Sequence, residues 1–138
     1  MQSRIAFILL LLLATASYSF GQASQGMPHR YDPTTEVTVT GTVEDVLHPT
    51  SPNGMAGTHV NLKTDSGVMD VHVGPEAFIS KQGFTIEKGD TLTVIGSKQL
   101  IGGKDALIAR EVKKGDKVLT LRDANGFPKW SRRGGALN

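Results

Sequence analysis

The residues of clearest chemical interest in this sequence are His59, Asp70 and His72, which fall in two short segments of alternating apolar and polar residues. Imidazole nitrogens and carboxylate oxygens are ligands that transition metals accept. Alternation at every second residue is typical of a half-buried β-strand, and a turn signal, Asp-Ser-Gly, separates the segments 58–64 and 68–73. The two segments therefore predict a β-hairpin that carries these three side chains on its outer face.

The register of this hairpin decides which side chains lie opposite each other. The apolar residues of both strands can face the same core only if the sequence numbers of two residues opposite each other add to an odd total. A total of 131 places His59 opposite His72 and Asn61 opposite Asp70, whereas a total of 133 places Asn61 opposite His72. In the first register the two imidazoles lie roughly 5 Å apart at Cβ, close enough to share a cation.

His48, in the loop after the first predicted strand, is a candidate third ligand. Asp70 is a candidate fourth group, or a partner that orients a ligating histidine. Two nitrogen ligands favour Cu(II) or Zn(II) over Ca²⁺ or Mg²⁺, which prefer oxygen. The pair also fits a simpler explanation, in which two partly exposed strand residues stack across the hairpin. A copper or zinc site therefore stands as a hypothesis beside that structural one.

The sequence lacks the residue sets that enzymes most often use. It contains no cysteine, which excludes disulfides, thiolate metal sites and cysteine nucleophiles. Ser66 and Ser80 have no evident base as a neighbour, and neither a nucleophile-elbow motif nor a phosphate-binding loop occurs. We therefore expect a protein that is not an enzyme.

The elements that would position the histidines form an all-β pattern. The chain has 138 residues, with 16 Gly and 6 Pro that separate short alternating segments, which suits one turn-rich domain. Strands are predicted at 35–47, 58–64, 68–73, after 90, at 106–112 and at 117–122, with a helix at about 76–82. Five strands with one short helix between the third and fourth predict a five-stranded OB-type barrel, and 117–122 is a short additional C-terminal strand. An SH3-like barrel is the alternative, although it would not need the helix.

The first predicted strand shows signs of a sharp bend. Gly41 interrupts it, and a residue without a side chain permits a bulge or strong coiling. After Val43 the apolar positions shift to Val46 and Leu47, so the alternation slips by one residue. A bent strand that serves two sides of a barrel would show this pattern.

The N-terminus has the features of a secretory signal peptide. One positive charge precedes the apolar run Ile5–Ala14, and small and polar residues follow. We predict a signal peptide at 1–23 with cleavage after Ala23; Ala16 is a competing site, and retention as an anchor is an alternative. The apolar run is shorter than the roughly 20 residues of a membrane span, and no second such run follows. The mature protein is therefore expected to be periplasmic or secreted, without a transmembrane segment.

The mature chain divides into a flexible lead-in at 24–34, the barrel at 35–122 and a basic tail at 123–138. Residues 24–112 carry 7 Lys and Arg against 11 Asp and Glu, whereas residues 113–138 carry 7 against 2. The high isoelectric point therefore belongs to the C-terminal part. The basic residues of the tail, Lys129, Arg132 and Arg133, could contact an anionic surface or an acidic partner. The alternative is a solubilising terminus whose aromatic residues, Phe127 and Trp130, fold back over the barrel.

Several stretches resemble the small exported OB-fold proteins of bacteria, which carry one barrel behind a signal peptide. These stretches are VTVTGTVEDV at 37–46, LKTDSGVMDVHVGP at 62–75, GDTLTVIGS at 89–97 and ALIAREV at 106–112. The segment KVLTLRDANGFPKW at 117–130 is similar to the C-terminal part of a group that includes domains of magnetosome-associated proteins. The resemblance implies an OB fold, and it supplies no catalytic motif for these residues.

An OB fold raises the question of nucleic-acid binding, and the composition disfavours it. OB domains bind single strands by stacking bases on aromatic residues of strands two and three within a basic groove. Segments 58–64 and 68–73 contain no aromatic residue and only one lysine, and the chain around them is net acidic. Nucleic acid is therefore the least favoured of the ligand classes.

These observations predict an exported, non-enzymatic OB-fold binding module of the cell envelope. Its partner would be an envelope protein or a small ligand. A periplasmic His-based protein that binds copper or zinc is the first alternative, and a nucleic-acid-binding OB protein is the second.

Overall fold

The alternating segments form six strands in a computed structural model that describes residues 31–131. In chain order the elements are η1 (Pro33–Thr35), β1 (Glu36–Leu47), β2 (Gly57–Thr64), β3 (Gly67–Pro75), α1 (Glu76–Lys81), β4 (Thr91–Ile101), β5 (Lys104–Lys114) and β6 (Lys117–Thr120). The predicted signal peptide, most of the predicted lead-in and residues 132–138 of the predicted tail lie outside the described residues. Within 31–131, no helix has the length and apolar character needed to cross a membrane.

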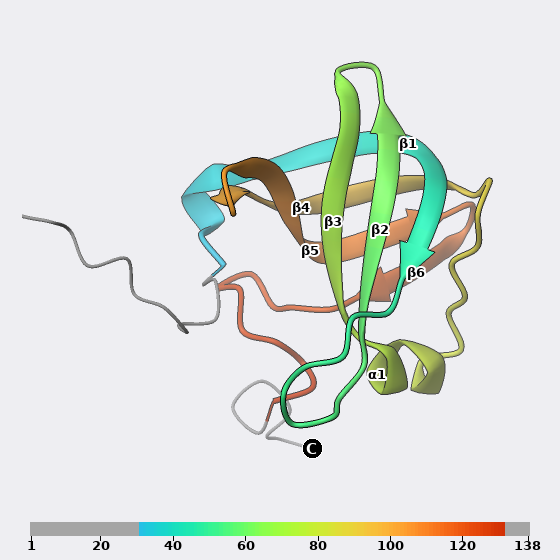
Figure 1. Ribbon diagram of the computed structural model, residues 1–138, viewed down its shortest axis with the longest axis vertical. Coiled ribbons are helices and arrows are strands. Elements are labelled where there is room, and N and C mark those ends of the chain that lie inside the picture. The colour runs from blue at the N-terminus through green and yellow to red at the C-terminus, as the bar shows by residue number, and fades with distance from the viewer. Residues whose placement is uncertain (1–30, 132–138) are drawn as a thin grey trace, which may run out of the picture.

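Five strands close into a barrel in the ring order β1-β2-β3-β5-β4 and back to β1 (Figure 1). The pairing that closes the ring is parallel and joins β3 to β5, from Asp70 opposite Ala106 to His72 opposite Ile108. α1 lies between β3 and β4 in the chain, and β6 pairs only with the end of β5, outside the ring. This order confirms the predicted OB-type barrel with its short helix and its additional C-terminal strand, and it excludes the SH3-like alternative.

β1 serves two sides of the barrel, as its sequence predicts. Its first half pairs with β4 and its second half with β2, and a bulge lies between Val43 and Asp45. Figure 1 shows the strand crossing the barrel and then bending downward toward the end where α1 lies. The bend brings Gly41 so close to β2 that a Cβ atom there would lie 2.3 Å from the carbonyl oxygen of Lys63. Only glycine allows the strand to coil this tightly.

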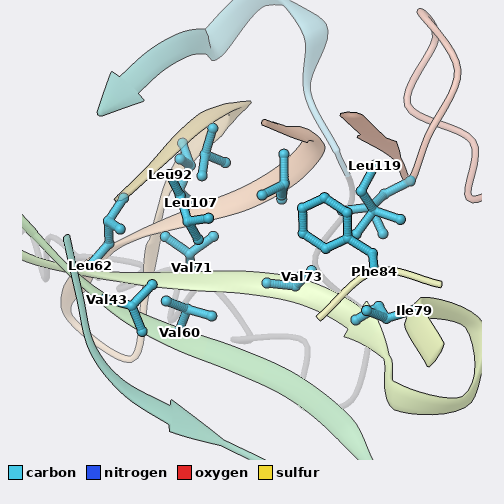
Figure 2. Packing of buried hydrophobic residues seen from close by; sticks show 14 residues of the cluster. Val43, Val60, Leu62, Val71, Val73, Ile79, Phe84, Leu92, Leu107 and Leu119 are labelled. Atoms are coloured by element: carbon cyan, nitrogen blue, oxygen red, sulfur yellow. The ribbon is translucent and has the colours of Figure 1, made fainter. Parts of the chain in front are cut away.

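The inward side chains fill the barrel with aliphatic residues, and α1 helps to close one end. Figure 2 shows Leu62 and Leu92 on one side of the cluster and Ile79 and Phe84 on the other. Ile79 and Phe84 are each only 5% exposed, while Phe78 is partly buried against the same cluster. These three residues cover the barrel end.

Tyr31 belongs to the predicted lead-in, yet it is buried against the barrel. Its hydroxyl donates a hydrogen bond to the carboxylate of Glu36, and the guanidinium of Arg110 on β5 donates two more to the same carboxylate, at 2.8 and 2.9 Å. The hydrogen bonds from Arg110, followed by that from Tyr31, hold the pKa of Glu36 below its usual range. Burial and the adjacent Glu36 raise the pKa of Tyr31 to about 12. The first residue that the structure describes is thus linked to β5 through Glu36.

The described part of the predicted tail folds back over the barrel through Trp130. This ring packs on Phe78 of α1 with 5.5 Å between ring centroids, and the Arg122 guanidinium lies 5.2 Å from its centroid and 5.8 Å from that of Tyr31. Phe127 differs from the expectation, because it is 50% exposed. Its amide donates to the Asp123 carboxylate and its carbonyl accepts from the Asp123 amide, within a turn that leaves the ring in solvent.

Replacing Gly41 by alanine is expected to lower the free energy of unfolding by about 2 kcal/mol or more, because the new methyl group would overlap the β2 backbone. Gly57→Ala is the matched control, since a Cβ atom there would make an ordinary contact of 3.6 Å. Urea unfolding of both variants measures the difference. Equal stabilities would contradict the close approach of β1 to β2.

Candidate metal centre

The observed hairpin register brings the two histidines face to face. β2 and β3 pair with His59 opposite His72 and Asn61 opposite Asp70, which confirms the register with a total of 131. Val60 and Val71 of the same strands point into the core and are fully buried. Because side chains alternate along a strand, the neighbouring histidines and Asp70 lie on the outer face.

A β-bulge ends the regular pairing directly beside the histidine pair. The register shifts between Thr58 and His59, so that β3 places one extra residue, Val73, between the partners of these two residues. Bulges re-aim the adjacent side chains, and they occur often next to binding sites. Gly74, the next residue of β3, has a φ of +152°. A Cβ atom there would lie 3.1 Å from the Trp130 ring. Sequence reasoning missed this bulge, although the glycines on both strands, Gly57 and Gly74, were a signal for it.

The Asp70 carboxylate bridges the two imidazoles. Its Oδ2 lies 3.0 Å from His72 Nε2 in a hydrogen bond, and its Oδ1 lies 3.5 Å from His59 Nδ1. The two rings are stacked, with 3.9 Å between centroids and 30° between planes. Asp70 was predicted as a fourth or orienting group, and the structure places it in direct contact with both histidines.

One oxygen of this carboxylate accepts no hydrogen bond. Asp70 Oδ1 is buried from solvent and makes no hydrogen bond, although its contact with His59 is electrostatically favourable. A buried polar atom without a partner costs about 1–3 kcal/mol, more for a charged group. A cation bound between the two histidines would supply the missing contact.

The surroundings of His59 favour its neutral form. Burial lowers the pKa of His59 below the usual 6.5, the charge of His72 lowers it further, and Asp70 opposes both effects. The His59 side chain is 29% exposed and that of His72 is 25% exposed, so both rings keep access to solvent. A neutral imidazole offers the lone pair that a metal ion needs.

The three side chains form a ligand set of suitable size for a transition metal. One ligand atom from each of His59, Asp70 and His72 lies within 4.8 Å of the other two. Tetrahedral ligands with bonds of about 2.0–2.1 Å are separated by about 3.3 Å, so small side-chain rotations bring this group into range. Three protein ligands would leave one coordination position open.

His48, the other candidate ligand, is not part of this group in the structure. Its Nδ1 lies 3.7 Å from the carboxylate of Glu76 at the start of α1, and its ring lines a separate cavity of about 220 Å³ with Phe84. A bridge between Thr50 and Ala56 closes the loop after β1. Asp70, from the neighbouring strand, takes the position expected for His48.

The site lies on the outer face of β2 and β3, the face that OB barrels commonly use for ligands. His59 also lines a cavity of about 320 Å³ between this face and the loop that joins β1 to β2. Figure 1 shows this loop and α1 at the same end of the barrel. The group of His59, Asp70 and His72 therefore adjoins this hollow.

Comparison with known protein families adds an independent observation. Residues 35–119 match the MamS/MamX magnetosome protein family, and this stretch includes all five strands of the barrel. The chain belongs to this family. The match confirms the resemblance to magnetosome-associated proteins, and it locates that resemblance in the barrel itself. No curated protein matches this MamS/MamX family member.

Solved structures similar to this MamS/MamX family member include two single-stranded DNA binding proteins. The protein from Thermus aquaticus is 20% identical with a TM-score of 0.49, and the match covers 60% of this chain and 41% of that chain. The mitochondrial protein Rim1 from S. cerevisiae is 13% identical with a TM-score of 0.45, over 67% and 98% of the two chains. The N-terminal domain of PriB from Thermoanaerobacter tencongensis is 14% identical with a TM-score of 0.47, over 61% and 99%.

The His59 imidazole is expected to titrate below the ordinary histidine pKa of about 6.5 in metal-free protein. Asp70→Asn should lower this pKa further, because it removes the negative charge that raises it, whereas His72→Asn should raise it. Titration of the ring C–H signals by NMR, with a chelator present, measures these shifts. A higher His59 pKa in Asp70→Asn would show that the carboxylate does not act on this ring.

Proposed function

We propose that this member of the MamS/MamX family is an exported, non-enzymatic OB-fold module that binds Cu(II) or Zn(II) at His59, Asp70 and His72. One observation carries the proposal: the Asp70 carboxylate contacts two stacked imidazoles, one of its oxygens is buried without a hydrogen bond, and the ligand atoms of the three residues lie within 4.8 Å of one another. An envelope protein or small ligand would occupy the open coordination position or the adjoining hollow.

The simpler explanation, a structural histidine pair, accounts for less of the geometry. Stacking at 3.9 Å brings together two groups that repel each other when protonated, and burial already disfavours the charged form of His59. A pair kept only for packing would gain more from apolar side chains, as at the buried positions of the same strands. A shared cation would contact the Asp70 Oδ1 atom, which accepts no hydrogen bond, and would use a lone pair of each imidazole.

The ligand chemistry favours copper or zinc among the common ions. Two nitrogens and one carboxylate suit Zn(II) and Cu(II), whereas Ca²⁺ and Mg²⁺ need six or more oxygens. The acidic balance of residues 24–112 also attracts cations toward the barrel.

Nucleic-acid binding does not carry over from the similar single-stranded DNA binding proteins. Those structures agree in fold at low identity, and fold alone gives no ligand. β2 and β3 contain no Phe, Tyr or Trp on which a base could stack, and their outer face carries Asp70 beside the histidines.

Calorimetric titration of the chain from Ser24, without an affinity tag, tests the metal site. We expect Zn(II) and Cu(II) to bind one ion per chain, with at least tenfold weaker binding in His59→Ala and in His72→Ala. Binding should weaken as the pH falls from 7 to 5, because both imidazoles must lose their protons to ligate.

Two variants sharpen this test. His48→Ala is the matched control and should bind like the wild type, because His48 contacts Glu76 instead of the metal group. Asp70→Asn keeps the shape and loses the charge, so it should bind more weakly than His48→Ala. No heat in the wild type, or equal heats in all variants, would refute the metal site.

Export is tested by the N-terminus of the mature protein. We expect the protein recovered from the periplasm or medium to begin at Ser24, because small residues stand at the positions that signal peptidase reads before it. Intact-mass spectrometry distinguishes this product from one that begins at Ser17. Full-length protein held in the membrane fraction would support the anchor alternative instead.

A further inference from the structure

Met55 faces the same hollow as His59, and the proposed Cu(II) or Zn(II) site makes no use of it. The cavity of about 320 Å³ is lined by Met55, from the loop between β1 and β2, and by His59, with Pro49 and Pro75 also in its wall. The Met55 side chain is 58% exposed, although it is one of the most apolar residues of that loop. Its exposure leaves the thioether free to reach a ligand in the hollow.

The backbone around Met55 is held in place while its side chain is not. The Met55 carbonyl accepts hydrogen bonds from the amide of Ser51, at 2.9 Å, and from the hydroxyl of the same residue, at 3.0 Å. The next carbonyl, of Ala56, accepts from the amide of Glu76 at 3.0 Å, which attaches the loop to the start of α1. A methionine side chain turns about three single bonds, so its sulfur can move across the cavity from a fixed origin.

The chemistry of a thioether next to imidazoles points to reduced copper. Thioether sulfur is a soft ligand that selects Cu(I), and imidazole also suits copper, whereas a carboxylate is a harder ligand that suits other ions better. Pro49 and Pro75 add apolar surface to the wall of the same hollow. A leucine would serve the packing of the loop equally well, but it could not ligate.

We propose that Met55 is a ligand for Cu(I), which binds at the same place through Met55, His59 and His72. In this second mode the thioether takes the role that Asp70 has with Cu(II) or Zn(II). The inference rests on the proposed metal site, because it uses both of its histidines. With Met55 as a ligand, the site would bind Cu(I) selectively, which the two histidines and the carboxylate alone would not do.

The test compares Cu(I) and Zn(II) affinities of the chain from Ser24 under anaerobic conditions. Competition with a chromogenic Cu(I) chelator, with ascorbate present, gives the Cu(I) affinity, and calorimetry gives the Zn(II) affinity. We expect Met55→Leu to bind Cu(I) at least tenfold more weakly and to bind Zn(II) like the wild type. Met69→Leu is the matched control, since Met69 packs against the core and should leave both affinities unchanged.

X-ray absorption of the Cu(I) complex supplies a readout that folding defects do not imitate. A sulfur neighbour of copper is expected in the wild type and in Met69→Leu, and its loss is expected in Met55→Leu. Unchanged Cu(I) affinity in Met55→Leu, or an equal loss of Zn(II) affinity, would overturn the role of Met55 and leave the Cu(II) and Zn(II) site standing. Failure of His59→Ala and His72→Ala to weaken Zn(II) binding would instead overturn the proposed function.

Discussion

The parallel pairing of β3 with β5 closes the barrel, and the paired residues include two of the three proposed ligands. Asp70, Val71 and His72 lie opposite β5 on one side while the same residues pair with β2 on the other. A strand hydrogen-bonded on both sides has little freedom to shift its register. With Val71 fixed in the core, Asp70 and His72 must both point outward, two residues apart. Closure of the barrel thus orders two of the three proposed ligands before any ion binds.

The residues that contact the bulged end of the hairpin come from distant parts of the chain. The bulge beside His59 depends on Gly74, whose left-handed conformation favours glycine and whose surface is covered by Trp130. Trp130 is held in turn by Phe78 and by the guanidinium of Arg122. The C-terminal segment therefore supports the end of the hairpin that carries the histidines.

The parts of this structure that the sequence predicts are those set by local pattern. The hairpin register follows from two apolar sets and a tight turn, and the ring order follows from a helix between the third and fourth strands. The burial of Tyr31 could not be predicted in this way, because it depends on an ion pair between Glu36 and Arg110, 74 residues apart. The contact of the His48 imidazole with Glu76 of α1 could not be predicted for a similar reason, because it joins two elements 28 residues apart.

The contact of Asp70 with both histidines shows where prediction from a strand pattern ends. Its strand position opposite Asn61 was predictable. That position alone describes an exposed carboxylate and does not indicate a contact with the histidines. Its contact with both histidines depends on side-chain rotation, which alternation along a strand does not specify.

A small closed barrel has no deep cleft, so a ligand must bind on its outer face with few contacts. Ion binding suits this constraint, because three ligand atoms on adjacent strands can hold a metal without a large interface. The open coordination position and the neighbouring hollow leave the ion accessible, which suits uptake and release better than permanent storage. The proposed Met55 thioether on the loop then adds Cu(I) to the ions that the site can bind, while the strand residues stay in the same positions. In the proposed site, the strands of the barrel would hold the histidines in place, and the loop would supply the ligand that selects Cu(I).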